Sequence, residues 1–296
     1  MDIGFIGAGK VGTSLGKLFA QGGLHVAGYF SRHADSAKRA SDFTGSNCYT
    51  SLASLLDASD ALFLTVPDGQ ILSVYQQLRE FDLAGKHIVH CSGSLSVAET
   101  FPGVTEAGAV GLSIHPLFPV ASATESWEPL RSAWFTLEGD DEAALSQWQD
   151  TLAGLGLKTQ TISGASKARY HAACVFSSNL MCALVAESVD LLSTCGFNPE
   201  DALSALKPLI QSNVDNILER GPVQALTGPV ERADDATVAK NAAALPSPAE
   251  QLLYAFASSR LVDVAEAKHP ERDYSHLQDQ IRLIINNSLD ERNCNG

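Results

Sequence analysis

The sequence predicts an α/β fold, a Rossmann-type doubly wound sheet, followed by an all-α C-terminal domain. Through residue 162, short apolar strands alternate with segments of helical period, which is typical of parallel βαβ units. A glycine-rich turn at residues 7–12 follows the first strand and opens the first helix. After residue 163, helical signals replace strand signals almost completely. We therefore expect two domains, a Rossmann-type domain at residues 1–162 and a helical domain at 163–296.

The N-terminal domain is expected to contain seven strands separated by helices. The predicted strands are residues 2–6, 25–31, 61–66, 87–91, 110–114, 134–137 and 158–162. The predicted helices are residues 11–21, 35–41, a segment after Asp68, and 141–155. The run 61–66 is almost entirely apolar, which is typical of a strand buried on both faces of a sheet.

The C-terminal domain is expected to contain four long helices, at residues 167–195, 199–220, 247–268 and 273–289. Gly196 ends the first helix, Pro199 begins the second, and Gly221-Pro222 ends it. The most apolar segment, residues 172–192, still carries polar and charged side chains, among them Ser177, Ser178, Asn179, Glu187 and Asp190, so it predicts a buried core helix and not a membrane span.

The composition excludes several classes of protein. With 45% hydrophobic residues the chain is not a disordered one. A net charge of −14, spread over both halves, argues against nucleic acid and anionic membranes as partners, but it leaves a small anionic ligand possible. None of the six cysteines forms a Cys-x-x-Cys pair, and the chain opens on an apolar strand without a charged leader. We therefore expect reduced thiols, a cytoplasmic location and no metal site.

The turn Gly7-Ala8-Gly9-Lys10-Val11-Gly12 has the spacing of a dinucleotide-binding loop. The first glycine permits the tight turn, the second lets backbone N–H groups approach a pyrophosphate, and the third lets the helix pack closely on the strand. The helix N-terminus then favours the phosphate charge. A glycine-rich structural turn is the alternative interpretation.

The end of the second strand selects the cofactor. An acidic residue there would bind the ribose 2′-hydroxyl, but this chain has Ser31-Arg32. A guanidinium and a hydroxyl suit a 2′-phosphate, so the sequence predicts NADP(H), with His33 and Arg39 as helpers. The alternative is a solvated arginine on a surface loop.

Polar side chains follow the later strands at the edge where ligands bind in such sheets. Val66-Pro67 is expected near the nicotinamide ribose, while Ser92, Ser94 and His115 are expected near the substrate. Two of these residues have alternative interpretations. The Ser92 hydroxyl could hydrogen-bond to the backbone of its own turn, and His115 could be a buried structural histidine before a proline.

Lys167 and His171 lie one helical turn apart and face the same way, on a stripe that also contains Cys174 and Ser178. A lysine and a histidine on an otherwise apolar helix suit proton donation to a carbonyl, since burial lowers the pKa of a lysine. A surface lysine with a capping histidine is the alternative. Asn179 lies off this stripe, but we also predict that it contacts a substrate.

The loop 226–232 interrupts the helical domain. Its polar groups, among them Thr227, could close over a substrate, and a plain connection is the alternative.

These residues together resemble the 6-phosphogluconate-dehydrogenase-like superfamily, which includes pyrroline-5-carboxylate reductase, 3-hydroxyisobutyrate dehydrogenase, ketopantoate reductase and prephenate dehydrogenase. The chain is most similar to a branch of Rossmann-like NADP oxidoreductases with a C-terminal domain of unknown function. Some members of that branch resemble an alternative ketopantoate reductase. The resemblance rests on residues 7–12, 66–68, 90–94, 115–116, 167–179 and 226–232.

Three details of this resemblance bear on the site. Superfamily dehydrogenases carry Gly-x-x-Lys-x-x-x-Asn at the domain junction, with the lysine as acid and base. The match here begins at Gly164, keeps Lys167 and has His171 in place of the asparagine. His115-Pro116 is similar to the segment of prephenate dehydrogenases whose histidine polarises the substrate hydroxyl. The branch usually shows Arg-Gly-Asp where this chain has Arg232-Ala233-Asp234.

The sequence and the resemblance together predict an NADPH-dependent reductase of a small carbonyl compound, with 2-dehydropantoate as the named substrate that the resemblance suggests. The expected catalytic residues are Lys167, His171, His115 and Ser92. The alternatives are a pyrroline-5-carboxylate-type imine reductase and a non-catalytic NADPH-sensing protein. Relatives commonly pair through the helical domain, so we expect a homodimer.

Overall fold

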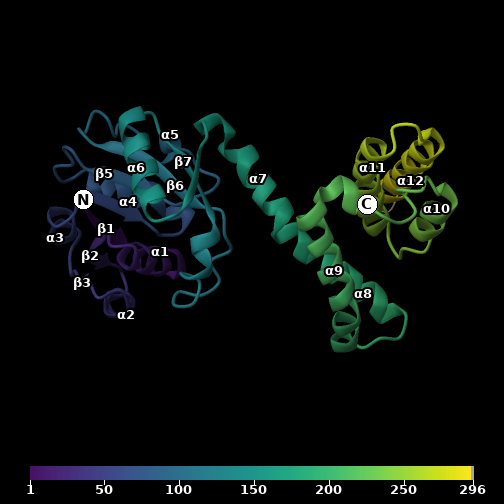
Figure 1. Ribbon diagram of the computed structural model, residues 1–296, viewed down its shortest axis with the longest axis horizontal. Helices are drawn as coiled ribbons and strands as arrows, with labels where there is room; N and C mark the ends of the chain where they lie inside the picture. Colours follow the sequence, from purple (N-terminus) through teal and green to yellow (C-terminus); the bar gives the residue numbers. More distant parts are fainter. Residues whose placement is uncertain (295–296) are drawn as a thin grey trace. The chain divides into compact units, whose positions relative to one another are not determined.

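The computed structural model describes residues 1–294, with side chains as far as Asp290. Its N-terminal part contains one eight-stranded sheet with the order β3-β2-β1-β4-β5-β6-β7-β8 (Figure 1). The strands are β1 (Asp2–Ile6), β2 (His25–Phe30), β3 (Asn47–Cys48), β4 (Ala61–Leu64), β5 (His87–His90), β6 (Val110–Pro116), β7 (Trp134–Glu138) and β8 (Lys158–Thr161). All neighbours are parallel except β6 and β7. The predicted doubly wound Rossmann-type sheet is confirmed.

The helices account for most of the remaining chain. They are α1 (Lys10–Gln21), α2 (Ala34–Thr44), α3 (Leu52–Asp57), α4 (Asp68–Leu78), α5 (Val97–Thr100), α6 (Glu142–Gly154), α7 (Lys167–Ser177), α8 (Asn179–Thr194), α9 (Pro199–Ala225), α10 (Asp235–Ala243), α11 (Pro248–Lys268) and α12 (Ser275–Cys294). The short elements β3, α3, α5 and α10 were not predictable from the sequence, because two to nine residues give too little periodicity.

The strands bury both faces of the sheet. Successive residues of a strand point to opposite faces, so Phe5 and Ile6 belong to two different apolar clusters. On the face of Phe5, its ring stacks on Tyr29 at 5.1 Å, while Phe63 meets Trp148 edge-on at 5.3 Å. Each such pair contributes about 0.5–1.5 kcal/mol beyond burial of its area. This packing fixes the strand ends that carry the site.

The chain divides into two compact units, Met1–Leu184 and Val185–Gly296, and the division falls inside α8. In the second unit, α11 and α12 pack side by side and α10 packs against both (Figure 1). Val238, Val262 and Ile281 belong to the apolar cluster that these three helices share. This region confirms the predicted all-α C-terminal part.

The prediction of one continuous helix at residues 167–195 is wrong. The segment is two helices, because Ser178 leaves helical geometry with φ −131° and ψ −77°. Its Oγ donates a hydrogen bond to the carbonyl of Cys174 at 2.7 Å. A serine hydroxyl that binds the carbonyl four residues back perturbs the helix at that point.

The prediction of a buried core helix at residues 172–192 is also wrong. No residue of α8 is buried, and in α7 only Lys167 is. Apolar side chains of this segment, such as Phe176 on α7 and Met181 on α8, are exposed. By length and composition alone, Gly164–Thr194 would be able to cross a membrane, because it contains an 18-residue stretch with a mean hydropathy of 1.5, and it is the one such segment among residues 1–294. A single segment of this kind is weak support for a membrane span.

Candidate functional site

The glycine loop lies where the strand order reverses, between β1 and β4. Gly7 has φ +107°, and a Cβ there would lie 2.7 Å from the carbonyl oxygen of Thr65. A Cβ on Gly12 would lie 2.3 Å from Thr65 Oγ1, which donates a hydrogen bond to the carbonyl of Gly7 at 2.8 Å. Only glycine therefore lets α1 pack this closely against the end of β4.

Gly9 differs from its two neighbours in the loop. A Cβ at this position would meet no other part of the chain within 4 Å, so packing alone does not require glycine here. Gly9 is the N-cap of α1, and no side chain caps this helix. The first backbone N–H groups of a helix have no intrahelical acceptor and favour an anion. The loop is thus open on the side that a pyrophosphate would approach.

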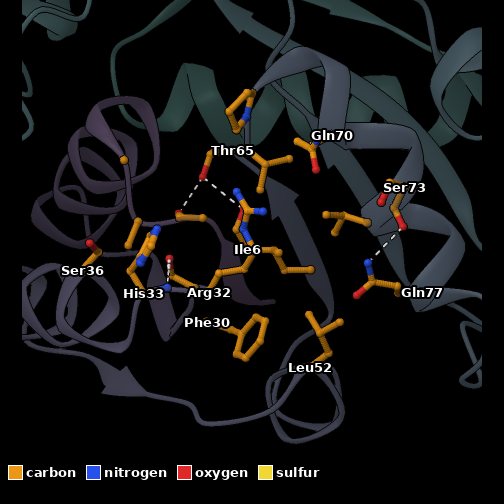
Figure 2. A pocket seen from close by; sticks show the side chains of 17 residues that line it. Ile6, Phe30, Arg32, His33, Ser36, Leu52, Thr65, Gln70, Ser73 and Gln77 are labelled. Carbon is orange, nitrogen blue, oxygen red and sulfur yellow. Dashed lines mark hydrogen bonds between the residues drawn. The ribbon is translucent and has the colours of Figure 1, made fainter.

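A cavity of about 450 Å³ lies against this loop (Figure 2). This volume is within the range of small-molecule sites, about 300–1,000 Å³. Its lining includes seven of the predicted cofactor residues: Gly7, Ala8, Gly9, Ser31, Arg32, Val66 and Pro67. Lys10, Val11 and Gly12, the other three, form the first turn of α1.

One end of the cavity is suited to a phosphate. Arg32 and His33 line it with Ser36, whose hydroxyl accepts a hydrogen bond from Arg39 at 3.1 Å. In Figure 2, His33 and Ser36 lie on the α2 side, and Gln70, Ser73 and Gln77 lie on the α4 side. These glutamine and serine residues, together with Leu52 on α3, carry no motif, so only the fold could identify them. The donor set fits a dinucleotide with a 2′-phosphate.

A second group of polar side chains lies at the ends of β5 and β6. Ser92 Oγ donates a hydrogen bond to Asp68 Oδ2 at 2.7 Å, and Ser94 Oγ lies 3.4 Å from the same oxygen. Asp68 directly follows Pro67, which lines the cavity. The group around Ser92 therefore adjoins the cavity at the start of α4.

Lys167 is part of this group, and it is buried, with 1% of its surface exposed. Its Nζ donates hydrogen bonds of 2.7 Å to the carbonyl of Ser92 and to Ser113 Oγ. Burial lowers the pKa of Lys167 to about 8, against the opposing effect of the Glu138 carboxylate. The ammonium group thus connects the first turn of α7 to both strand ends.

His115 and His171 meet beside Gly93. A Cβ on Gly93 would lie 2.8 Å from His115 Nε2 and 2.8 Å from His171 Nδ1, so glycine keeps this space free of a side chain. His171 Nδ1 is buried and has no hydrogen-bond partner in the described part of the chain. Burial lowers the pKa of His115 to about 4, and the charges of Lys167 and His171 act in the same direction. His115 is therefore neutral at pH 7.

Tyr170 completes this group, and the sequence analysis did not select it. Its hydroxyl oxygen lies 2.7 Å from His115 Nδ1, and the two rings meet edge-on at 5.6 Å. The only signal in the sequence is its position three residues after Lys167, which places both side chains on one helical face. The partner of His115 cannot be found from sequence, because β6 and α7 are 55 positions apart.

The structure brings together five of the predicted residues, Ser92, Ser94, His115, Lys167 and His171, and does not place Ser178 or Asn179 with them. Ser178 and Asn179 lie at the junction of α7 and α8, where Ser178 Oγ lies 3.0 Å from Asn179 Oδ1. Ser178 follows His171 by seven positions, about 10 Å along a helix. Thr227 lies in the second unit, between α9 and α10.

The loop between α9 and α10 is held by side chains from α11 and the turn after it. Lys268 Nζ donates to the carbonyl of Leu226 at 2.8 Å, and Tyr274 Oη donates to that of Glu231 at 2.8 Å. The Glu231 carboxylate accepts a hydrogen bond from His269. This loop is therefore a fixed element of the second unit.

The comparisons with known proteins agree with this geometry. Residues 1–116 match a Rossmann-like domain, and residues 133–261 match DUF2520, a domain of unknown function. The chain has no significant match among curated protein sequences.

Solved structures with this fold span nearly the whole chain. Protein TM1727 from Thermotoga maritima has 26% identity and a TM-score of 0.69, over 90% of this chain and 99% of its own. A candidate NADP oxidoreductase from Bacteroides fragilis has 21% identity and a TM-score of 0.67, over 88% and 98%. An imine reductase from Myxococcus stipitatus, solved with NADP+, has 18% identity and a TM-score of 0.59, over 95% and 100%. The chain is thus similar to a Rossmann-like domain over residues 1–116 and to DUF2520 over residues 133–261.

Proposed function

We propose that this protein is an NADPH-dependent oxidoreductase that reduces a small carbonyl or imine compound. The observation that carries the proposal is the cavity at the switch point of the sheet, with a glycine loop along one wall and Ser31 and Arg32 at one end. The names of similar structures support it, since they include a candidate NADP oxidoreductase and an imine reductase bound to NADP+.

Each part of the cavity has a role in this proposal. The α1 N-terminus and the N–H groups around Gly9 bind the pyrophosphate, and Arg32 binds the 2′-phosphate. Reduced nicotinamide, when bound, supplies a hydride. The hydroxyls of Ser92 and Ser94, together with the imidazoles of His115 and His171, orient a polar substrate group. The two serines contact Asp68, the residue after the cavity residue Pro67, and the two imidazoles lie beside Gly93, between these serines.

Two substrate classes follow from different observations. The sequence motifs resemble those of an alternative ketopantoate reductase, which favours 2-dehydropantoate or a similar 2-oxo acid. The structural neighbours include a reductive aminase from Aspergillus terreus and several imine reductases, which favours an imine such as pyrroline-5-carboxylate. We still predict substrate contacts for Ser178, Asn179 and Thr227. A non-catalytic NADPH sensor would have no need of the buried polar group around Lys167.

The cofactor assignment is tested with Arg32→Gln and Lys38→Gln. Both remove one positive charge near or on α2, but Lys38 pairs with Asp42 and does not line the cavity. A lost charge-assisted hydrogen bond costs about 1.5–3 kcal/mol, so Arg32→Gln should weaken NADPH binding about 10- to 100-fold in calorimetry. NADH binding should hardly change, and Lys38→Gln should behave like the wild type. Equal NADPH affinity in Arg32→Gln and wild type would contradict the assignment.

The substrate class is tested by following NADPH absorbance with a panel of 2-oxo acids and cyclic imines. Oxidation of NADPH with one class only would select it. NADPH binding without turnover of any member would favour the sensor.

We also propose that the protein forms a homodimer through its apolar helices. Phe176 and Leu184 in the first unit are 71% and 47% exposed, and Leu209 and Leu218 on α9 are 67% and 80% exposed. Exposed apolar patches of this kind mark association surfaces. A second copy of the same chain offers the same apolar surface, so it is the partner that we expect.

A further inference from the structure

The hydrogen bond between His115 and Tyr170 bears on which ring nitrogen of His115 carries the hydrogen. A neutral imidazole carries one hydrogen, on Nδ1 or on Nε2. Nδ1 lies 2.7 Å from the Tyr170 hydroxyl, and Nε2 faces Gly93. If the Tyr170 hydroxyl donates to Nδ1, the hydrogen of the ring must be on Nε2. If Nδ1–H donates to the hydroxyl instead, Nε2 carries no hydrogen.

The surroundings of Tyr170 favour donation by its hydroxyl. Burial raises the pKa of Tyr170 to about 12, although a hydrogen bond from Thr136 lowers it, so the hydroxyl keeps its hydrogen at neutral pH. Thr136 Oγ1 lies 3.5 Å from the carbonyl of His115, beyond the usual length of a hydroxyl hydrogen bond. Its hydrogen is thus available to the Tyr170 oxygen. The Cys174 thiol also contacts the Tyr170 hydroxyl and raises its pKa, but sulfur is a weak acceptor, so the Tyr170 hydrogen points at His115 Nδ1.

We propose that Tyr170 is a positioning residue that fixes the tautomer of His115, so that Nε2–H points beside Gly93 toward the oxygen or nitrogen of the substrate. The inference rests on the proposed reductase function for its chemical meaning. His171 Nδ1, buried and without a partner, is the second imidazole nitrogen at this place. Gly93 leaves room for both nitrogens to reach a ligand.

His115 and Tyr170 together supply the proton that the reduction consumes. The substrate carbon accepts the hydride, and the electron pair of its C=O or C=N bond moves to the oxygen or nitrogen. That atom takes the hydrogen of His115 Nε2, and Nδ1 takes the hydrogen of the Tyr170 hydroxyl. After the product leaves, Nε2 takes a proton from water and Nδ1 returns its hydrogen to the Tyr170 oxygen, which restores the starting tautomer. Lys167 does not transfer a proton in this scheme; its two hydrogen bonds hold the β5 and β6 ends in place.

The tautomer is tested by ¹⁵N NMR of the imidazole rings in the protein without cofactor, with His115→Gln to assign the signals. We expect His115 to carry its hydrogen on Nε2 from pH 6 to 8. The other ionisable groups that face it are Lys167 and His171 on α7 and His90 on β5, and the pKa of His90 is lowered to about 3 by burial. Tyr170→Phe should convert the ring to a mixture of tautomers, and Thr136→Val should do so in part.

Tyr75→Phe is the matched control, because the Tyr75 hydroxyl is also buried but has no hydrogen-bond partner among the described residues. It should leave the His115 signals unchanged. A wild-type ring with its hydrogen on Nδ1, or a tautomer that survives in Tyr170→Phe, would overturn the inference.

Kinetics then separate this inference from the proposed function. Tyr170→Phe should lower kcat on the order of 10²-fold, while KM and NADPH affinity stay near the wild-type values. If no carbonyl or imine is reduced but the tautomer is as expected, the proposed function fails and the positioning role stands. If turnover is normal in Tyr170→Phe, the positioning role fails and the proposed function stands.

Discussion

At the scale of single residues, Ala233 has an unusual backbone angle. Its φ is +57°, and it is the one non-glycine residue with positive φ in the described chain. The resemblance noted from the sequence would place glycine at this position. An L-residue in this left-handed region costs about 1–2 kcal/mol, which glycine avoids.

Ala233→Gly should therefore stabilise the protein. Glycine loses more backbone entropy on folding, about 0.5–1 kcal/mol, so the net gain should be about 0.5–1 kcal/mol in the free energy of unfolding. Urea denaturation measures this change. Ala239→Gly, the same substitution inside α10, should instead destabilise by about 1 kcal/mol. A loss of stability in Ala233→Gly would show that this angle carries no strain.

At the scale of elements, the loop between α9 and α10 depends on one carboxylate. Burial alone raises the pKa of Glu231, but the hydrogen bond from His269 and the charges of Lys268 and Arg272 outweigh burial, so the pKa lies below its ordinary value. A carboxyl with a lowered pKa in the folded state stabilises the protein above its unfolded pKa, and this stabilisation is lost as the pH falls through the folded pKa.

Glu231→Gln should lower the free energy of unfolding by about 1–2 kcal/mol at pH 7. The difference from wild type should shrink as the pH falls below about 4.5, because the wild-type carboxyl then becomes protonated. Denaturant titrations between pH 3.5 and 7 measure it. Glu271→Gln is the control: its carboxylate is 75% exposed and lies 3.6 Å from the same histidine, so its effect should be small at every pH. A difference that is independent of pH would contradict the role of the Glu231 charge.

The elements also show where sequence patterns are sufficient and where they are not. Strands β1 and β4 were predictable, because they are apolar runs bounded by turn residues. The break at Ser178 was not, because it arises from one side-chain hydrogen bond inside a segment whose composition is helical throughout. The exposure of α8 was not predictable either, since an apolar helix has the same sequence whether the chain or a second copy covers it.

At the scale of the whole molecule, the apolar helices predict association. Leu218→Lys should convert the proposed homodimer to a monomer in light scattering, since a charge in an apolar interface is costly. Leu218 is 80% exposed within the chain, so the variant should still fold. Asn216→Lys, two positions away and on nearly the opposite side of α9, should leave the dimer intact. A wild-type protein that is monomeric at micromolar concentration would contradict the proposal.

The sequence by itself determined the parts of this protein that depend on local spacing. The glycine loop, the Ser31-Arg32 pair and the alternation of strands and helices follow from neighbouring residues, and the structure places most of the predicted cofactor residues around one cavity. Tertiary structure alone decided which side chains face one another across long separations. Tyr170 meets His115, and Lys167 bridges Ser92 and Ser113, because the parallel strands end at one edge of the sheet where α7 begins. Side-chain partners 54 to 75 positions apart are set by packing in three dimensions, and no local pattern encodes them.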